Sequence, residues 1–228
     1  MKVKFGSLVV DGRGKIGGHV ASKNRGGAYL RTKVTPVNPQ TSFQATVRDR
    51  ITTYSQGWRT LTAAQRAAWN GAVTSWQKTD IFGDLKTPSG QNLYIRLNNN
   101  LLQAGQSAIT SPPLPNSVVG PVTLALTAAA GTPAVSLVFT ASPVAAATTF
   151  VVRMTPQVSA GKSFVKSLYR NLTTVAAAGT SPVDLLSAYN ARFGTLVAGQ
   201  KIFVEVFAVS NTTGVRTTAI STSAIVGA

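Results

Sequence analysis

The sequence predicts an α+β protein with several domains: an extended basic β-arm, a small three-helix unit and a C-terminal all-β sandwich. Three observations indicate this fold class. The first 37 residues alternate short β-like runs with glycine-rich turns. Apolar residues then recur at helical spacing, and after about residue 118 they recur at every second position. The expected domains are the arm at 1–37, a helical docking unit at 38–110, a proline-rich linker at 111–117 and the sandwich at 118–228.

The arm contains three candidate strands, at Val3–Val10, His19–Ser22 and Ala28–Val34. Glycine-rich turns separate them. These residues supply too few apolar side chains for a core of their own, and a ribbon of this size is marginal in water. We therefore expect an extended arm or an open ribbon that pairs with a neighbouring molecule.

The first helix of the docking unit is predicted to begin at Asn38 and Pro39, because asparagine caps helices well and proline fits the first helical position. Gly57 is expected to weaken or end this helix, because glycine is a poor helix former. Thr62 and Gln65 then have the spacing of a capping box, which predicts the start of a second helix.

A loop is expected at 79–88, and Ser89 is expected to cap a third helix with leucines along one side. Three tryptophans, Trp58, Trp69 and Trp76, lie in this part of the chain. We interpret them as the core of the helical unit rather than as a platform for sugars or bases, because large aromatic side chains contribute most by burial.

Strand-like alternation follows the linker, whose clearest part is Ser111–Pro115. The expected strands are Val122–Leu126, Val135–Phe139, Thr149–Met154, Ser167–Val175, Ile202–Val209 and Val215–Ser221. A short helical turn is expected at Pro182–Ser187. Six or seven short strands in about 110 residues favour a β-sandwich.

One segment of this part is more specific. A Leu-x-x-Gly turn at Leu196–Gly199 precedes the alternating strand Ile202–Val209, and Asn211–Gly214 follows it. This segment resembles the penultimate strand and final hairpin of fibronectin type III domains. Ile202 stands where that family usually has a tyrosine, so the tyrosine-corner hydrogen bond is absent. The resemblance covers about 30 residues and implies an immunoglobulin-like sandwich.

The first 105 residues contain a second set of motifs. These are Gly14-Lys-Ile-Gly17, Tyr29-Leu-Arg31, Asn38-Pro39, Gln44, Arg48, Trp58-Arg-Thr-Leu-Thr62, Gln65-Arg66, Trp69-Asn70, Gly90-Gln-Asn-Leu-Tyr94 and Leu97-Asn98. They are similar to an uncharacterised group of tailed-phage and prophage proteins. The resemblance implies a structural role in the virion, with other virion proteins as partners (capsid, portal or tail) in multiple symmetric copies.

The charge of the chain is strongly basic and uneven. Lys and Arg number 22 against 6 Asp and Glu, which gives a net charge of +16. Residues 1–100 hold 15 of the basic and 4 of the acidic residues. A basic excess concentrated in a flexible arm suggests an acidic partner, either nucleic acid or an acidic protein surface.

No catalytic or metal-binding group stands out. The chain has no cysteine, which excludes disulfides and thiolate metal sites. His19 is the only histidine, and nothing marks a converging pair among the acidic residues. Asp80 and Asp84 can bind a cation, but solvated loop acids near Lys78 and Lys86 are favoured. We therefore expect a protein that is not an enzyme and has no metal, cofactor or small-molecule substrate.

Residues Gly12 to Gly17 match the Gly-x-Gly-x-x-Gly string of dinucleotide-binding loops. Such a loop needs a strand before it, a helix after it and an acidic residue about 20 positions further on. Here β-like residues follow, and the next acidic residue is Asp49. A bent basic arm, in which glycine gives the backbone freedom for the bends, is the favoured interpretation.

The residues expected to bind the partner lie in the arm: Arg13, Lys15, Gly17, Gly18, Arg25, Gly26, Gly27, Tyr29, Leu30 and Arg31. The glycines allow the arm to turn or to approach another backbone closely. The arginines can pair with acidic groups, and the tyrosine and leucine can anchor in a pocket.

Two kinds of partner fit these residues. Nucleic acid would be bound by phosphate contacts and stacking, whereas an acidic protein lattice would use the same electrostatics. The alternation of Tyr, Val and Leu, the two tryptophans at helix ends and the bulky sandwich favour protein. No stretch reaches the roughly 20 apolar residues of a membrane helix, so no membrane partner is expected. The N-terminal residues are unconvincing as a signal peptide, so synthesis in the host cytoplasm is expected.

The sequence thus predicts a non-enzymatic structural component of a tailed-phage virion. Its N-terminal arm would dock on capsid or head–tail proteins, and its sandwich would be displayed. The alternative is a nucleic-acid-binding protein that is packaged with the genome or contacts it.

Overall fold

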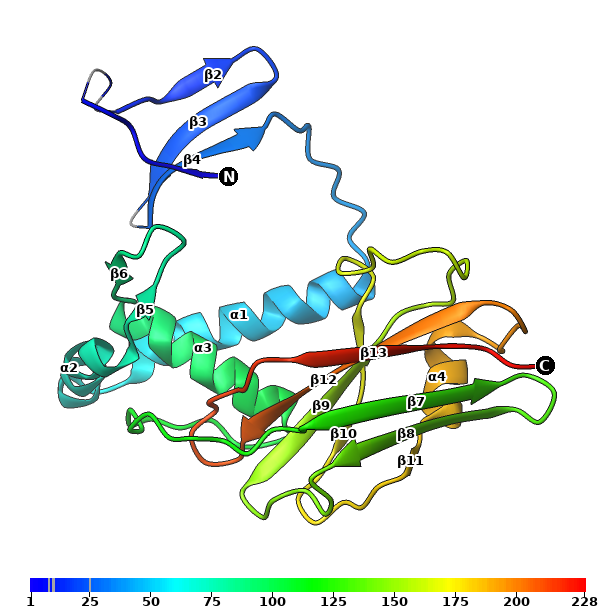
Figure 1. Ribbon diagram of the computed structural model, residues 1–228. Coiled ribbons are helices and arrows are strands. Elements are labelled where there is room, and N and C mark those ends of the chain that lie inside the picture. Colours follow the sequence, from blue (N-terminus) through cyan, green and yellow to red (C-terminus); the bar gives the residue numbers. More distant parts are fainter. Residues whose placement is uncertain (8, 10, 25) are drawn as a thin grey trace. The chain divides into compact units, whose positions relative to one another are not determined.

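The computed structural model describes residues 1–7, 9, 11–24 and 26–228 (Figure 1). These residues form helices and several antiparallel sheets, which confirms the α+β class. They cluster into two compact units. Unit 1 comprises Met1–Asp49 and Gln77–Thr87, and unit 2 comprises Arg50–Trp76 and Pro88–Ala228. This division does not coincide with the domain boundaries expected at 38 and 111–117, which stay predictions.

Unit 1 is built on a four-stranded antiparallel sheet in the order β1-β4-β3-β2. The strands are β1 (Lys2–Val3), β2 (Gly14–Ile16), β3 (His19–Asn24) and β4 (Gly27–Thr32). β1 is much shorter than the strand expected at Val3–Val10, of which Leu8 and Val10 lie outside the described residues. The loop expected at 79–88 contains part of a small hairpin of β5 (Lys78–Thr79) and β6 (Leu85–Lys86).

The sheet of unit 1 has almost no core. Among the residues that the structure describes in this unit, Ala21 alone is buried, with 6% of its surface exposed. An apolar interior is the main source of stability in a small domain. Unit 1 therefore gains little from burial within itself, as its sequence leads one to expect.

Helix α1 (Ser42–Thr60) differs from the prediction at both ends. It does not begin at Asn38, because Gln40 adopts a left-handed φ of 48°, which a helix cannot include. Thr41 caps it instead, and its hydroxyl oxygen accepts a hydrogen bond from the Gln44 N–H at 3.3 Å. The helix also continues through Gly57, where a Cβ would lie only 3.0 Å from the Tyr94 hydroxyl. The glycine gives Tyr94 room to pack and does not end the helix.

The other two predicted helices begin where their caps indicate. In α2 (Ala63–Ala72), Thr62 and Gln65 form the reciprocal capping box, and a short 3₁₀ helix at Val73–Trp76 follows. In α3 (Gly90–Gln103), the Ser89 side chain accepts from the Asn92 N–H. The buried core of these helices contains Tyr54, Leu61, Trp69, Trp76, Leu93, Tyr94 and Leu97. The tryptophans Trp69 and Trp76 are core residues, as predicted, and Trp58 is half-buried against this cluster.

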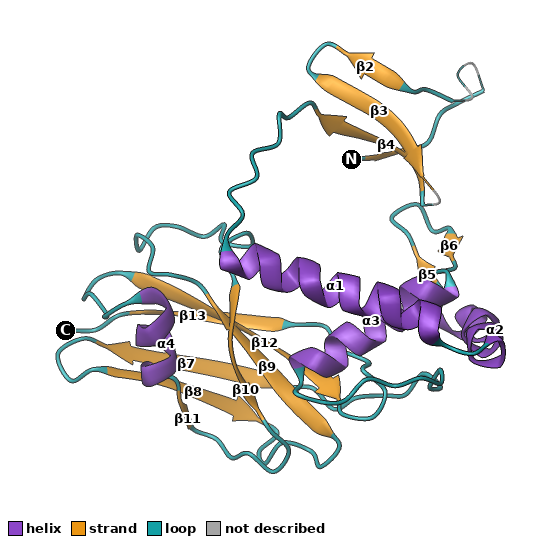
Figure 2. Ribbon diagram, turned by 180° about the vertical axis from the view of Figure 1, so that it is seen from behind, coloured by secondary structure: helices purple, strands orange, loops and turns teal. Residues whose placement is uncertain are grey.

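The C-terminal part consists of two antiparallel sheets that share one core (Figure 2). One sheet contains β11 (Val183–Asp184), β8 (Ala134–Thr140) and β7 (Thr123–Ala129) in that order. The other contains β10 (Arg170–Val175), β9 (Thr148–Met154), β12 (Lys201–Ser210) and β13 (Ile220–Ile225). Alternate residues of β12, such as Val204 and Val206, are fully buried. Phe139 of β8 meets Phe150 of β9 edge-on at 5.3 Å between ring centroids, which joins the two sheets.

Three elements of this part differ from the expectation, of which the first is β10, which begins at Arg170 and not at Ser167. Within the strand expected at 215–221, β13 begins only at Ile220, because the register with β12 shifts by one residue between the Val209–Arg216 bridge and the Val206–Ile220 pair. The Ala208 N–H donates to the Thr217 hydroxyl oxygen, and the Thr217 N–H donates to the Ala208 carbonyl, both at 3.0 Å. The helical turn expected at 182–187 is wrong in its first half, where Val183 and Asp184 form strand β11 and pair with β8, and the helix α4 (Leu186–Phe193) begins only near its end.

The C-terminal end of α3 packs on the outer face of the four-stranded sheet (Figure 2). An apolar cluster there contains Ala104, Val151, Phe207 and Val209. These strand residues alternate with the core residues of β9 and β12, so they lie on the opposite face of the sheet. The side-chain amide of Asn100 donates to the Gly214 carbonyl at 2.8 Å. The helices and the sheets of unit 2 are thus packed together.

The chain between α3 and β7 is tied to its surroundings by side chains. Asn98 accepts from the Ile109 N–H at 2.7 Å and donates to the Ile109 carbonyl at 3.1 Å. The Trp69 indole N–H donates to the Thr110 carbonyl at 2.8 Å. Further on, the Thr213 hydroxyl donates to the Asn116 side chain at 2.8 Å. The chain is therefore fixed directly before the expected linker at 111–117 and again, through Asn116, near the end of that linker.

Candidate partner-binding surface

Strand pairing in unit 1 decides which of the predicted binding residues share a face. Lys15 of β2 lies opposite Val20 of β3, which in turn lies opposite Arg31 of β4. Tyr29 lies opposite Ser22, two residues away from that row. Paired residues share a face of a sheet, and so do residues two apart on one strand. The structure therefore brings Lys15, Tyr29 and Arg31 to one face, which we call the basic face.

Leu30 lies on the opposite face, where it pairs with the buried Ala21. Its backbone bonds to the N-terminal residue: the Leu30 N–H donates to the Met1 carbonyl at 2.8 Å, and the Met1 amino group donates to the Leu30 carbonyl at 2.9 Å. Leu30 thus helps to hold β1 in the sheet and does not join the basic face. Arg25, which was also predicted to bind, lies outside the described residues.

The four predicted glycines lie at the two hairpin turns. Gly17, with φ of 55°, and Gly18 join β2 to β3, whereas Gly26 and Gly27 lead into β4. Gly27 has φ of 105°, and the Gly26 N–H donates to the Asn24 side-chain oxygen at 2.8 Å. A Cβ at Gly17, Gly18 or Gly27 would meet no described atom within 4 Å. Within the chain these glycines serve the turns and not a close backbone approach.

The positive charge of Arg13 is partly balanced by the carboxylate of Asp11. Its Nε lies 3.5 Å from Asp11, and the Lys23 ammonium lies 3.7 Å from the same carboxylate. No ion pair of Lys15 or Arg31 is found among the described residues. The charge of Arg13 is therefore partly neutralised within the chain, whereas Lys15 and Arg31 remain available to a partner.

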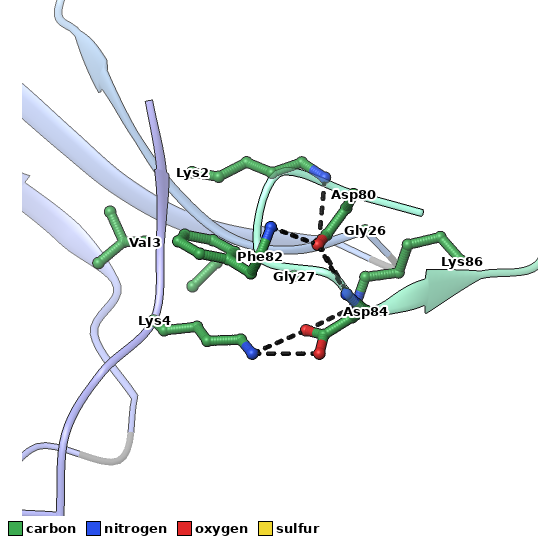
Figure 3. A pocket seen from close by; sticks show the side chains of 10 residues that line it. Lys2, Val3, Lys4, Gly26, Gly27, Asp80, Phe82, Asp84 and Lys86 are labelled. Carbon is green, nitrogen blue, oxygen red and sulfur yellow. Dashed lines mark hydrogen bonds and ion pairs between the residues drawn. The ribbon is translucent and has the colours of Figure 1, made fainter. Parts of the chain in front are cut away.

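A cavity of about 100 Å³ lies at the β5–β6 hairpin, within unit 1 (Figure 3). Two of the predicted glycines, Gly26 and Gly27, line it together with residues of β1 and the hairpin. The Lys4 ammonium lies 5.4 Å from the centre of the Phe82 ring, a cation–π contact. The cavity is small, and the side chains of unit 1 itself occupy its rim.

Ion pairs join the hairpin to β1 (Figure 3). The Lys2 ammonium lies 3.4 Å from Asp80, and the Lys4 ammonium lies 3.0 Å from Asp84. Lys86 lies 3.9 Å from Asp80 and 3.8 Å from Asp84. Each carboxylate therefore has lysines for neighbours, which opposes a bound cation. No group of three potential metal ligands occurs among the described residues.

Asp80 is not the solvated loop acid that its position suggests. Only 5% of its side chain is exposed. Its Oδ1 accepts from the Phe82 N–H at 2.8 Å and from the Asp84 N–H at 3.2 Å. The hydrogen bond from the Phe82 backbone, ahead of the pairing with Lys2, lowers the pKa of this carboxyl below its ordinary value. Asp80 organises the hairpin turn and ties it to β1.

Acid is expected to loosen the hairpin. Because the pKa of Asp80 is lowered in the folded state, its carboxylate adds stability above the unfolded value of 3.8, and that stability is lost as the pH falls through the lower folded pKa. The Phe82 and Asp84 amide signals, followed by NMR from about pH 6 to pH 2, should move together with the Lys2 signals. Asp80→Asn should remove this titration. Signals that do not respond to acid would contradict this role.

Lys2 and Lys4 are absent from the residues that the sequence singled out, although both form ion pairs with the hairpin. Their partners Asp80 and Asp84 lie 78 and 80 residues further along the chain. The only sequence signal for these ion pairs was opposite charge. Opposite charge does not identify which lysine pairs with which carboxylate when the two lie so far apart in the chain. The Gly-x-Gly-x-x-Gly string at 12–17 forms β2 and the turn after it, and a strand follows.

No protein-family model and no curated protein matches this sequence. Among solved structures, the chain is similar to an Fn3-like protein from Clostridium thermocellum, with 20% sequence identity and a TM-score of 0.30. That match covers 49% of this chain and 93% of that chain. The likeness is weak and concerns the kind of fold alone. No helix that the structure describes is long and apolar enough to cross a bilayer.

Proposed function

We propose that this chain is a non-enzymatic structural component of a tailed-phage virion, and that it docks through the basic face of unit 1 on an acidic surface of a capsid, portal or tail protein. Unit 2, with its C-terminal part as an immunoglobulin-like sandwich, is then the displayed part. The resemblance of the first 105 residues to tailed-phage proteins supports the setting in the particle.

The observation that carries the proposal is the combination of a cationic face and a missing core. Lys15, Tyr29 and Arg31 share one face of a sheet in which Ala21 is the single buried residue described. A sheet without a core gains stability when a partner covers it. Unpaired lysine and arginine select an acidic partner and speed its encounter.

Charge reversal tests the docking face. The double variant Lys15→Glu/Arg31→Glu is expected to reduce incorporation into particles about tenfold or more, because like charges then face each other. The matched control is Lys162→Glu/Lys166→Glu, which changes the net charge equally at two exposed lysines of unit 2. Incorporation is measured as copies per particle against the wild type. Equal loss in both double variants would mean that only net charge matters and would contradict the proposal.

The alternative, binding to nucleic acid, rests on the same cations and predicts a different result. The affinity for duplex DNA would then be high and would fall steeply with salt as counterions are released. Tight DNA binding at physiological salt, together with normal incorporation of a chain that lacks residues 1–35, would favour this alternative. Weak DNA binding with failed incorporation of the same truncated chain is expected if the partner is a protein.

A further inference from the structure

The sheet of unit 1 has two edge strands, β1 and β2, and their surroundings differ. β1 forms one edge, and the hairpin of β5 and β6 lies beside it through the ion pairs of Lys2 and Lys4. β2 forms the other edge, where all three residues, Gly14–Ile16, are exposed. Exposed edge strands present unpaired N–H and C=O groups that another strand can join. Among the described residues, no residue of β2 itself forms an ion pair, and the nearest carboxylate, Asp11 before the strand, pairs with Arg13 and Lys23.

The register shows which backbone groups of β2 face outward. The Lys33 N–H donates to the Gly18 carbonyl at 2.8 Å. Hydrogen-bonded and non-hydrogen-bonded pairs alternate along antiparallel strands, so Gly18 and Val20 both direct their backbone N–H and C=O groups toward β4. Val20 therefore directs its backbone groups away from β2, and its pair with Lys15 is of the non-hydrogen-bonded kind. It follows that the N–H and C=O of Lys15 point away from the sheet, toward the open edge.

The side chains beside this edge indicate what can pair with it. Ile16 is 69% exposed, and it would contact an apolar side chain of an added strand. Lys15 has no ion pair among the described residues, Arg31 adds positive charge in the same sheet, and Lys33 follows directly after β4. A second copy of this chain would bring the same cations to the edge, and like charges on paired strands repel. An acidic strand is attracted instead.

We propose that the open edge of β2 takes an extended, acidic segment of the partner protein as a fifth strand. The Lys15 backbone forms the central pair of hydrogen bonds, an acidic side chain opposite Lys15 pairs with its ammonium, and Ile16 packs against an apolar neighbour. This inference rests on the proposed function and names how the partner is held. Main-chain bonds supply the affinity in this mode of binding, and the side chains supply the selectivity.

The first test uses the full chain and a synthetic peptide of eight residues, capped at both ends, in which valine alternates with glutamate. The peptide is expected to slow hydrogen exchange at the Lys15 amide of the wild type, measured by NMR. A peptide with lysine in place of glutamate, and one N-methylated at alternate residues, should give no protection. Protection that is absent at Lys15, or that appears equally with the N-methylated peptide, would overturn the proposal.

Variants at Lys15 separate backbone pairing from charge. Lys15→Pro removes the outward N–H and should weaken peptide binding about tenfold or more, whereas Lys15→Ala keeps it and should weaken binding about threefold. Edge strands tolerate proline, and unchanged amide signals of Ser22 and Tyr29 show that the sheet is intact. Equal losses of peptide binding in the two variants would overturn strand addition. So would duplex DNA that slows hydrogen exchange at the Lys15 amide as much as the peptide does.

Particles distinguish this inference from the proposed function. Lys15→Pro should be incorporated poorly, as should the double charge reversal Lys15→Glu/Arg31→Glu. If the proline variant is incorporated normally and the charge-reversed chain is not, docking on the basic face stands and strand addition is wrong. If both are incorporated normally, the proposed function itself fails.

Discussion

Replacing Gly214 with alanine is expected to lower the free energy of unfolding by about 3 kcal/mol or more, because two costs add. Gly214 has φ of 69°, in the left-handed region, where a residue with a Cβ pays about 1–2 kcal/mol. A Cβ there would also collide with the Leu97 carbonyl oxygen and lie 3.1 Å from Leu101 Cγ. Those atoms belong to α3, so relief requires the helix and the turn after β12 to separate.

Two other glycines make matched controls for this substitution. Gly105 has φ of 73° but no described atom within 4 Å of its Cβ position, so Gly105→Ala measures the backbone cost alone. Gly161 has neither a left-handed φ nor a near neighbour, so Gly161→Ala should be close to neutral. The expected order of destabilisation is Gly214, then Gly105, then Gly161.

Urea unfolding of the three variants, followed by tryptophan fluorescence, measures these differences. The side-chain amide signal of Asn100 adds a local readout, because Asn100 donates to the Gly214 carbonyl at 2.8 Å. That signal should shift in Gly214→Ala and stay unchanged in the controls. Equal destabilisation by Gly214→Ala and Gly105→Ala would mean that α3 does not pack on this turn.

Trp69→Ala is expected to destabilise the chain by about 3–5 kcal/mol, the usual cost of removing a large buried aromatic side chain. Trp69 is fully buried, and its ring meets Tyr94 edge-on at 5.4 Å between centroids. Its indole N–H also donates to the Thr110 carbonyl at 2.8 Å, which fixes the chain after α3. The substitution therefore creates a cavity and leaves a carbonyl without its partner.

Two comparisons separate these contributions. Trp69→Phe keeps most of the ring contact with Tyr94 but loses the bond to Thr110, so its cost should be about 1–2 kcal/mol. Trp58→Ala removes a half-buried ring from the same cluster and should cost less than Trp69→Ala. Denaturant unfolding gives all three values. If Trp69→Ala left stability unchanged and instead abolished binding to a sugar or a base, the assignment of Trp69 to the core would be wrong.

Local signals in the sequence were reliable where one segment decides its own structure. The capping box of Thr62 and Gln65 and the cap at Ser89 set two helix starts through bonds that span three residues. The alternation in β12 predicted a buried strand, because one face of the strand is apolar from end to end. The same kind of signal failed at α1, where the left-handed Gln40 moves the start beyond Asn38.

The candidate binding site was likewise predicted only in part from the sequence. The sequence placed basic and aromatic residues in a glycine-rich arm, and glycine turns join its strands as expected. It could not say that Lys15, Tyr29 and Arg31 share a face while Leu30 lies on the other. A shift of one residue in register exchanges the two faces of a strand, and composition does not decide the register.

Features that depend on near neighbours or on totals could be predicted from the residues: the α+β class, the basic excess, the shortage of apolar residues in the arm and the caps of α2 and α3. Contacts between distant segments are visible only in the folded chain. The hairpin of β5 and β6 holds β1 through Lys2 and Lys4, and Gly214 admits the backbone of α3. Each such contact links groups tens of residues apart, and many other pairs of the same chemistry were available to the chain. Packing of the whole fold selects among them, because only one arrangement brings the partners within bonding distance.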